Sequence, residues 1–282
     1  MFSTPNSLSV LTVRHGRSTN NNLLERLYQD KSLTPSAMET KWLQQRSHDP
    51  KLTSLGEHEA IQLGTWLQSS KITQSKHLIV FTSPFKRTLD TTAGIVSSLH
   101  KADYTVVAHP DIFETGGVYS TSATGERTGP GQCLTAAEIR TQFQYDVSLL
   151  PRQGQWYTSG WEDDAAACNR AKRVAAWMKT EMKAVVDGLR KTKEKDDTRG
   201  VLVLMVMHAH FINQLTKELC TIQDDPLLFS KSSNTFAAQP MNFITPNTAT
   251  NLFSLSGGKV AVHWISSTQH LGHSSQYLLS HL

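Results

Sequence analysis

Cysteine is scarce in this sequence of 282 residues. The three cysteines, Cys133, Cys168 and Cys220, lie far apart, are odd in number and form no CxxC pair. This pattern excludes a disulfide framework and a zinc site built on paired thiolates. We expect all three to be inert residues, packed or partly exposed.

Long hydrophobic runs are also missing. The longest, residues 201–207, is far shorter than the roughly 20 residues that a membrane-spanning helix needs. Residues 1–6 carry no positive charge and no apolar run, a pattern that predicts no secretory signal. We therefore expect a soluble, reduced protein of the cytoplasm with no membrane partner.

Neither sign of charge is in strong excess. The 28 basic and 24 acidic residues give a formal net charge of +4, spread along the chain. A spread surplus of this size predicts no nucleic-acid partner. With 38% hydrophobic and 18% charged residues, the composition predicts a packed core and argues against disorder.

Four short apolar runs predict buried strands: residues 8–13, 77–82, 104–108 and 201–207. The first and last are apolar at nearly every position, which is typical of strands covered by helices on both faces. Charged or nucleophilic side chains follow each of these two runs: Arg14 and His15 after the first, and His208 after the last.

Apolar residues at helical spacing fill the segments between these runs. We expect Thr53 to cap one helix, and Ser83 to cap a second with Pro84 in its first turn. A longer helix is expected to begin after residues 162–164 and to run past Leu189 into the charged stretch 191–199, itself a solvated loop. Two further helices are expected after Thr135 and after His208.

Alternating strands and helices predict an α/β fold, a three-layer sandwich with a mostly parallel central sheet flanked by helices. No internal repeat is visible. We expect a single domain over residues 1–282, with insertions at about 21–50 and 115–160 at the edge of the sheet.

The strand ends carry an unusual set of charges. Ligands in such folds lie beyond the carboxyl ends of the strands and against helix N-termini. The residues expected there are cations and imidazoles: Arg14, His15, Arg17, Arg87, His208 and His210. If these ends converge, they form a site for a dianion such as phosphate, because the planar guanidinium meets phosphate oxygens in pairs.

A histidine in such a site is also a candidate nucleophile. Neutral imidazole attacks a phosphoryl group that arginines have made electrophilic, and a carboxylic acid then protonates the departing alcohol. Glu114, just beyond the 104–108 strand, supplies that carboxyl, with Asp111 as the second choice.

Five blocks of this sequence, in order, resemble the histidine phosphatase (phosphoglycerate mutase-like) superfamily, branch 1. They are Arg14-His15-Gly16, Leu52-Thr53-Ser54-Leu55-Gly56 with Glu59-Ala60, Ser83-Pro84-Phe85-Lys86-Arg87-Thr88 with Thr91, His208-Ala209, and the late Asn247-Thr248-Ala249-Thr250 with Gln269-His270-Leu271. The resemblance spans nearly the whole chain.

The resemblance implies a phosphohistidine mechanism without metal or cofactor. It gives His15 as the nucleophile and Glu114 as the general acid. Arg14, Arg87 and His208 would hold the phosphoryl oxygens. It also adds Asn20, at the place of a phosphate-contacting asparagine of the family.

Several positions depart from the family pattern. Arg17 stands where many members carry Glu or Gln, and Glu59 replaces the usual Gln. His210 occupies a position that is often small. We count Arg17 and His210 with the phosphate-binding residues. The blocks typical of the glycolytic mutase are absent, so hydrolysis is favoured over phosphoryl transfer.

The Gly-rich stretch 116–131 begins beside Glu114 and is a candidate lid. Tyr119 and Arg127 within it are candidates to contact the part of the substrate that is not phosphate, and Trp161 is a candidate pocket wall.

The leading hypothesis is a metal-independent phosphomonoesterase for a small phosphorylated metabolite. The alternatives are a phosphoglycerate mutase or fructose-2,6-bisphosphatase-like sugar phosphatase, a phosphoprotein phosphatase, and a non-catalytic phosphate-binding module. His208 and His210 as a metal pair form a further alternative. Hydrolysis that needs neutral His15 and protonated Glu114 together predicts a bell-shaped pH profile.

Overall fold

Six strands form one mixed sheet in the order β3-β2-β6-β1-β7-β8. They are β1 (Leu8–Arg14), β2 (Lys76–Thr82), β3 (Tyr104–Ala108), β6 (Gly200–Met207), β7 (Thr250–Ser256) and β8 (Lys259–Ser267). β3, β2, β6 and β1 run parallel, and β7 and β8 add an antiparallel edge. The computed structural model describes residues 7–74, 76–100, 104–191, 200–222 and 242–272. The four expected strands and the mostly parallel sheet are confirmed.

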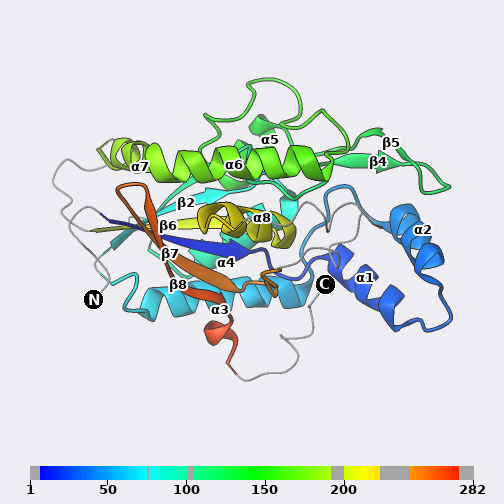
Figure 1. The fold of residues 1–282 in the computed structure, drawn as a ribbon, viewed down its shortest axis with the longest axis horizontal. Coiled ribbons are helices and arrows are strands. Elements are labelled where there is room, and N and C mark those ends of the chain that lie inside the picture. The colour runs from blue at the N-terminus through cyan, green and yellow to red at the C-terminus, as the bar shows by residue number, and fades with distance from the viewer. Residues whose placement is uncertain (1–6, 75, 101–103, 192–199, 223–241, 273–282) are drawn as a thin grey trace.

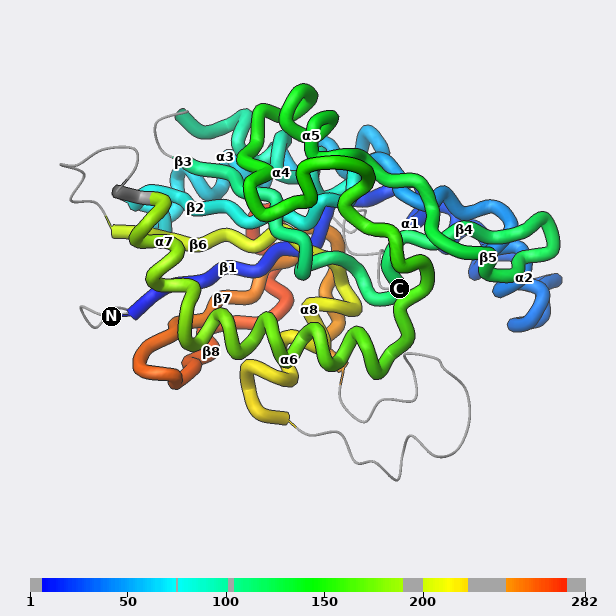
Figure 2. Tube along the Cα trace, turned by 90° about the horizontal axis from the view of Figure 1, so that it is seen from above, coloured from blue at the N-terminus to red at the C-terminus, as the bar shows by residue number. Residues whose placement is uncertain are grey.

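Helices cover both faces of the sheet, as the uniformly apolar strands predict. α3 (Ser54–Ser69) and α4 (Lys86–Ser97) pack on one face, and α6 (Asp164–Thr180), α7 (Met182–Lys191) and α8 (Ala209–Leu219) pack on the other. In Figure 1 α6 and α7 lie on one side of the strands and α3 on the other, and in Figure 2 the strands lie side by side in the order of the sheet. Each layer has its own buried core: Leu63 and Leu89 belong to one, and Met178 and Leu215 to the other.

Strand pairing brings three separate segments to one edge of the sheet. β1 and β6 are in parallel register up to Arg14 opposite Met207. The pairing continues beyond both strands, since the His15 N–H donates to Met207 O at 2.9 Å and the Ser83 N–H donates to Val206 O at 3.0 Å. His15, Ser83 and His208 therefore emerge side by side.

Most of the expected helix starts are confirmed. Thr53 caps α3 by accepting the Gly56 N–H. Thr135 and Glu138 form a capping box at the start of α5 (Ala136–Phe143). Asp163 caps α6 by accepting the Ala166 N–H.

Two helix expectations are wrong. The long helix expected to run past Leu189 is divided at Glu181 into α6 and α7, and residues 192–199 lie outside the described part of the chain. α4 begins at Lys86, so Ser83 does not cap it. Phe85 is extended there, and Asp49 accepts the first free N–H of the helix, that of Lys86, at 2.8 Å.

The two insertions meet beyond the carboxyl ends of the strands. α1 (Thr19–Gln29) and α2 (Pro35–Gln45) come from the first, and the hairpin of β4 (Tyr119–Thr121) and β5 (Arg127–Pro130) comes from the second. Figure 1 shows all four elements at the end toward which β1 and β6 point. The Thr121 hydroxyl donates to Leu43 O at 2.7 Å, which joins the hairpin to α2. The insertions thus cap one end of the sheet. The single domain over 1–282 stays a prediction.

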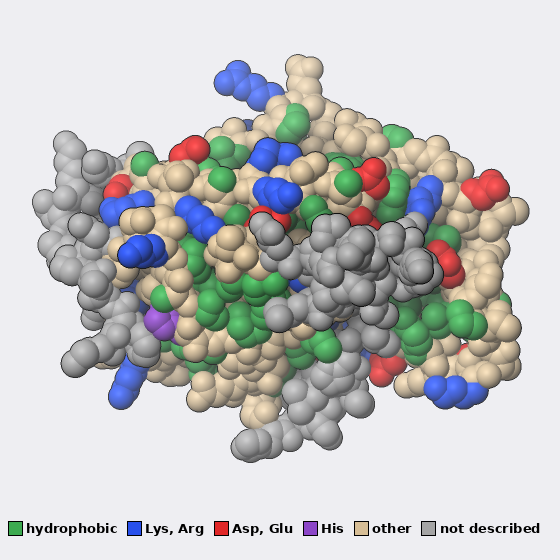
Figure 3. All heavy atoms as spheres, in the orientation of Figure 1, with side chains coloured by type: hydrophobic (Ala, Val, Ile, Leu, Met, Phe, Trp, Pro, Cys, Tyr) green, Lys and Arg blue, Asp and Glu red, His purple; other side chains and the backbone are tan. Residues whose placement is uncertain are grey.

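The described surface carries both signs of charge. On the face drawn in Figure 3, Lys and Arg side chains are interspersed with Asp and Glu side chains. The three cysteines form no disulfide within the described part of the chain and are half-buried. None of the described helices is long and apolar enough to span a bilayer.

Two glycines let α3 approach the loop that follows β1. A Cβ on Gly56 would lie 2.2 Å from Arg17 O, and one on Gly16 would lie 2.4 Å from Gly56 O. Both contacts are with backbone atoms, so no side-chain rotation relieves them. This close approach fixes the loop that carries His15 against the first turn of α3.

We predict that Gly56→Ala destabilises the protein by about 2 kcal/mol, because the added methyl forces two backbone segments apart. Gly188→Ala in α7 is the matched control, since a Cβ there meets nothing within 4 Å. The control should raise stability by about 0.5–1 kcal/mol through helix propensity. Urea denaturation of both variants measures this, and equal effects would contradict the close approach.

Candidate active site

His15 lies at the carboxyl end of β1 with only 4% of its surface exposed. Its Nδ1 lies 2.7 Å from Gly16 O and its Nε2 lies 3.1 Å from the Nε of Arg87. A carbonyl oxygen only accepts and a guanidinium only donates, so Nδ1 carries the proton and Nε2 keeps its lone pair. The nucleophilic atom of the ring therefore faces the arginine.

The charge state of His15 follows from its surroundings. Burial, reinforced by the positive charges of Arg87 and Arg14, lowers the pKa of His15 well below its usual value. The imidazole is therefore neutral throughout the neutral pH range, as nucleophilic attack requires.

Two guanidinium groups are buried beside this ring. Arg14 is 4% exposed and Arg87 is 8% exposed. The Nη1 of Arg14 donates to Thr245 O at 2.8 Å. Burial lowers the pKa of each arginine to about 10, so both remain charged at neutral pH. Two buried cations favour a bound anion, because burial removes the water that would otherwise solvate them.

His208 completes this side of the site as the N-cap residue of α8. It is fully buried, and its ring centroid lies 5.3 Å from that of His15. Its Nε2 lies 2.9 Å from the Ser83 hydroxyl, while its buried Nδ1 has no hydrogen-bond partner among the described residues. Burial, then the charge of Arg87, lowers the pKa of His208 well below its usual value. A phosphoryl oxygen would supply the missing partner of Nδ1.

Glu114 approaches the cations from the loop after β3. Its Oε1 accepts the N–H of Thr115 at 2.9 Å and that of Phe211, in the first turn of α8, at 3.1 Å. Its charge acts on both Arg14 and Arg87, which places the carboxyl within electrostatic range of the two guanidinium groups.

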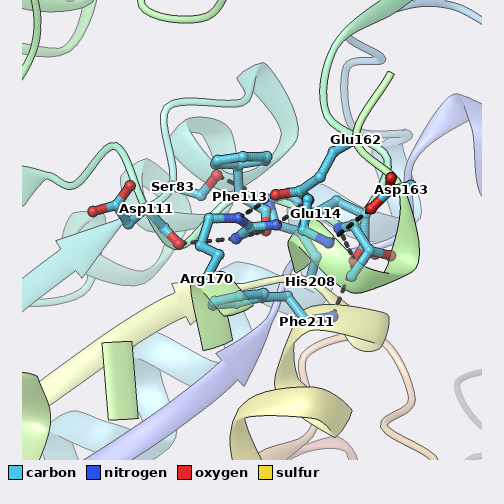
Figure 4. A network of polar contacts seen from close by, with 11 residues as sticks. Ser83, Asp111, Phe113, Glu114, Glu162, Asp163, Arg170, His208 and Phe211 are labelled. Carbon is cyan, nitrogen blue, oxygen red and sulfur yellow. Dashed lines mark hydrogen bonds and ion pairs between the residues drawn. The ribbon is translucent and has the colours of Figure 1, made fainter. Parts of the chain in front are cut away.

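Arg170 in α6 holds the Glu114 loop in place, and Figure 4 shows its contacts. It is 2% exposed and forms a two-bond ion pair with Glu162, at 2.8 and 2.6 Å. Its Nη1 donates to the carbonyl oxygens of Asp111 and Phe113, both at 2.9 Å. Asp111 thus contributes its backbone carbonyl to this contact, and the residue itself is exposed.

Aromatic rings enclose the same guanidinium from two elements. The Cζ of Arg170 lies 3.5 Å from the ring centroid of Phe113 and 4.2 Å from that of Phe211. Phe113 precedes Glu114, and Phe211 donates its N–H to the Glu114 carboxyl. Arg170 therefore fixes Glu114 relative to the start of α8.

Two further carboxyls are buried at the margin of the site. Asp49 accepts the Lys86 N–H at 2.8 Å, and Glu59 accepts the Arg17 N–H at 2.8 Å. Burial raises the pKa of each to about 7, against the lowering effect of the nearby arginines. Both carboxyls are thus only partly ionised at neutral pH and neutralise the cations incompletely.

The structure brings five of the predicted site residues together: Arg14, His15, Arg87, Glu114 and His208. It directs two of the other three elsewhere. Arg17 turns toward α1, where it contacts Asn22 and pairs with Glu25. Asn20 uses both its amide atoms on the backbone of Ser47, at 2.9 and 3.0 Å. His210 is exposed in the first turn of α8.

Two residues of the site, Asp49 and Arg170, were not predicted from the sequence. Arg170 had a detectable signal, because it occupies the apolar stripe of its helix between Ala167 and Val174, where an unpaired cation would be costly. Asp49 had none, since its role depends on a contact with α4. Ser83 was found for the wrong reason, as a helix cap.

No three His, Cys, Asp or Glu side chains in the described ranges lie grouped so as to hold a metal ion. His208 and His210, the alternative metal pair, differ in environment, one buried against Ser83 and the other exposed.

We predict that Glu59→Gln stabilises the protein more at pH 8 than at pH 5. The pKa of Glu59 is about 7 in the folded protein, and it returns to the ordinary glutamate value of 4.5 on unfolding. Raising the pH through this window therefore removes stability from the wild type and none from the variant. We expect a gain of roughly 2 kcal/mol at pH 8 by urea denaturation. Glu57→Gln, exposed on the same helix, is the control, and a pH-independent gain would contradict the raised pKa.

Part of the chain matches a known protein family. The model of the histidine phosphatase superfamily (branch 1) matches residues 10–119. No curated protein matches the chain significantly.

Three solved structures of similar fold differ widely in sequence. The ecdysone phosphate phosphatase of Bombyx mori, in complex with tungstate, is 17% identical with a TM-score of 0.54, over 95% of this chain and 96% of that one. YhfR of Bacillus stearothermophilus is 17% identical with a TM-score of 0.49, over 94% and 99%. A phosphoserine phosphatase mutant of Entamoeba histolytica, with phosphoserine, is 14% identical with a TM-score of 0.46, over 94% and 99%.

At these identities the first of the three shows a shared fold, and the lower TM-scores of the other two add no weight. The family match includes Arg14, His15 and Arg87, and the fold extends the likeness to nearly the whole chain. The resemblance seen in the sequence is thus confirmed over residues 10–119, which match the model of the histidine phosphatase superfamily, branch 1.

Proposed function

We propose that this chain is a phosphomonoesterase that hydrolyses a small phosphorylated metabolite through a phosphohistidine on His15. The observation that carries the proposal is the state of the His15 ring. Its Nε2 keeps a lone pair, faces Arg87, and lies in a buried cluster with Arg14 and His208.

In the first step, the Nε–H of Arg87 turns from His15 Nε2 to an oxygen of the bound phosphoryl group, and the lone pair that this frees on Nε2 attacks the phosphorus of the substrate. The N–P bond forms as the bond from phosphorus to the ester oxygen breaks. Arg14 and Arg87 stabilise the charge on the transferring group, and Nδ1 of His208 contacts one of its oxygens. Glu114, in its protonated form, gives its proton to the leaving oxygen.

In the second step, water attacks the phosphohistidine. Glu114, now a carboxylate, takes a proton from this water as the O–P bond forms. The N–P bond breaks, and the electron pair returns to Nε2. Inorganic phosphate leaves, and the enzyme regains neutral His15 and protonated Glu114. No metal and no cofactor takes part.

The similar structure from Bombyx mori is named a phosphatase and was solved with tungstate. Its name and the family match support hydrolysis of a phosphomonoester. The mutase, the phosphoprotein phosphatase and the binding module have no observation in their favour here. Cytoplasmic location stays a prediction from the sequence.

The test of this function is hydrolysis of phenyl phosphate, with a chelator present, by the wild type and by His15→Ala. We expect turnover by the wild type and a loss of at least about a thousandfold in the variant, because the nucleophile is gone. His58→Ala, an exposed histidine on α3, is the control and should keep full activity.

Loss of wild-type activity on chelation would overturn the phosphohistidine mechanism in favour of the metal pair. Hydrolysis that survives in His15→Ala would overturn His15 as nucleophile. Phosphoryl transfer to added 2- or 3-phosphoglycerate, faster than release of phosphate, would make the protein a mutase.

Arg170 gives a second prediction, on the positioning of Glu114. In Arg170→Lys, one ammonium replaces the planar group that contacts Glu162 and two carbonyls, so Glu114 loses its fixed place. We expect kcat for phenyl phosphate to fall about tenfold with little change in KM, since the phosphate-binding residues are untouched. Steady-state kinetics as a function of pH check this.

Arg173→Lys, exposed on the same helix, is the matched control and should be unchanged. A rise in KM alone in Arg170→Lys would show that Arg170 acts on substrate binding and not on Glu114.

A further inference from the structure

A cluster of cations and aromatic rings lies where the two insertions meet. We call it the rim cluster: Arg46 after α2, Tyr119 in β4, Arg127 in β5 and Trp161 before α6. The Cζ of Arg46 lies 3.9 Å from the ring centroid of Tyr119, and that of Arg127 lies 3.6 Å from the ring of Trp161. The two rings meet edge to face, 4.8 Å apart at 88°.

The backbone is shaped to allow this packing. Trp161 lies against Gly116, where a Cβ would stand 2.7 Å from its ring. Gly116 also has a φ of +90°, which strongly favours glycine. The Nη1 of Arg46 donates to Tyr119 O at 3.1 Å, which ties the first insertion to the second. The cluster is thus held by contacts from four segments.

The charge of the rim cluster has no counterpart near it. Among the described residues, no carboxylate lies within 4.0 Å of a guanidinium nitrogen of Arg46 or Arg127. Burial lowers the pKa of Arg46, Tyr119 partly offsets this shift, and the charge of Arg127 adds a further lowering. Two guanidinium groups are therefore kept close together against their mutual repulsion, with one face of each stacked on a ring. Stacking leaves the N–H groups at the edge available for an anion.

The rim cluster lies next to the phosphoryl site, on the side of the general acid. Gly116, under Trp161, is two residues beyond Glu114, and its carbonyl accepts the N–H of Glu162, the ion-pair partner of Arg170. The charge of Arg46 also reaches Arg87 and lowers its pKa. In the proposed mechanism Glu114 protonates the leaving oxygen, so the leaving group is held beside Glu114, two residues before the Gly116 against which Trp161 packs.

We propose that the rim cluster is a second anion subsite, and that the substrate carries a carboxylate or a second phosphate on its leaving group. The inference rests on the proposed phosphatase function and narrows its substrate class to phosphomonoesters with two anionic groups. Arg127 supplies a planar pair of donors to the second anion, and Arg46 adds charge from the side. Tyr119 and Trp161 hold both guanidinium groups in place.

The experiment compares three esters that share one leaving-group ring: phenyl phosphate, 4-carboxyphenyl phosphate and 1,4-phenylene bisphosphate. The quantity measured is the ratio of kcat/KM for each anionic ester to that for phenyl phosphate, in the wild type, Arg127→Met and Arg173→Met. Intrinsic differences in leaving-group reactivity cancel when one ratio is compared across variants.

We expect Arg127→Met to lower this ratio about fivefold, a modest factor because Arg127 is exposed and water screens its charge. Arg173→Met removes an exposed arginine from α6 and should leave the ratio as in the wild type. Arg127→Lys keeps the charge without the planar pair of donors and should fall between. The ester with the larger drop identifies the second anion as carboxylate or phosphate.

An unchanged ratio in Arg127→Met, with phenyl phosphate still hydrolysed, would overturn the subsite and leave the phosphatase function standing. If no ester is hydrolysed, the phosphatase function fails, and binding of phenylphosphonate and 4-carboxyphenylphosphonate by calorimetry gives the same ratio without turnover. A preference for the carboxylated phosphonate that Arg127→Met removes would then support the subsite. Equal binding in both proteins would overturn it.

Discussion

Two guanidinium groups, Arg14 and Arg87, are buried around one uncharged imidazole, and this arrangement governs the rest of the site. Water would solvate such cations strongly, and burial removes that solvation. Two of the carboxyls whose charges act on these cations, Asp49 and Glu59, have pKa values raised to about 7 by their own burial and are only partly ionised at neutral pH. A bound phosphoryl group would add negative charge beside both guanidinium groups.

The fold supplies this arrangement through backbone contacts. The parallel pairing of β1 with β6 places His15 and His208 at one edge of the sheet, and β2 brings Ser83 beside them. Gly16 and Gly56 let the first turn of α3 lock the His15 loop from the other side. These backbone contacts fix the loop that carries His15, and the contact of Nδ1 with Gly16 O then orients Nε2 toward Arg87.

Sequence patterns predicted the parts of the molecule that depend on local chemistry. The strands β1 and β6 followed from uniform apolar runs, the helix starts at Thr53 and Thr135 from capping side chains, and the start of α6 from the acidic residues 162–164. The residues at strand ends followed because parallel strands end at a common edge. Arg14, His15, Arg87, Glu114 and His208 do meet there.

The errors arose where a contact between distant segments decides the outcome. Ser83 looked like a helix cap, but it contacts His208, 125 residues away, and Asp49 serves the helix in its place. Arg17 stands beside the nucleophile in sequence, yet Glu25 draws its side chain toward α1. The break between α6 and α7 at Glu181 and the ion pair of Arg170 with Glu162 were likewise not predicted from local sequence patterns. No local pattern encodes which carboxylate a long cation will reach.

The hairpin of β4 and β5 and the helix α2 are joined by hydrogen bonds from Thr121 to Leu43 and from Arg46 to Tyr119. Neither insertion completes the rim alone, although more than 70 residues separate them along the chain. A change of length in one insertion therefore displaces the other. A chimera of related chains that replaces this rim therefore has to replace both insertions together, because each contributes contacts that hold the other.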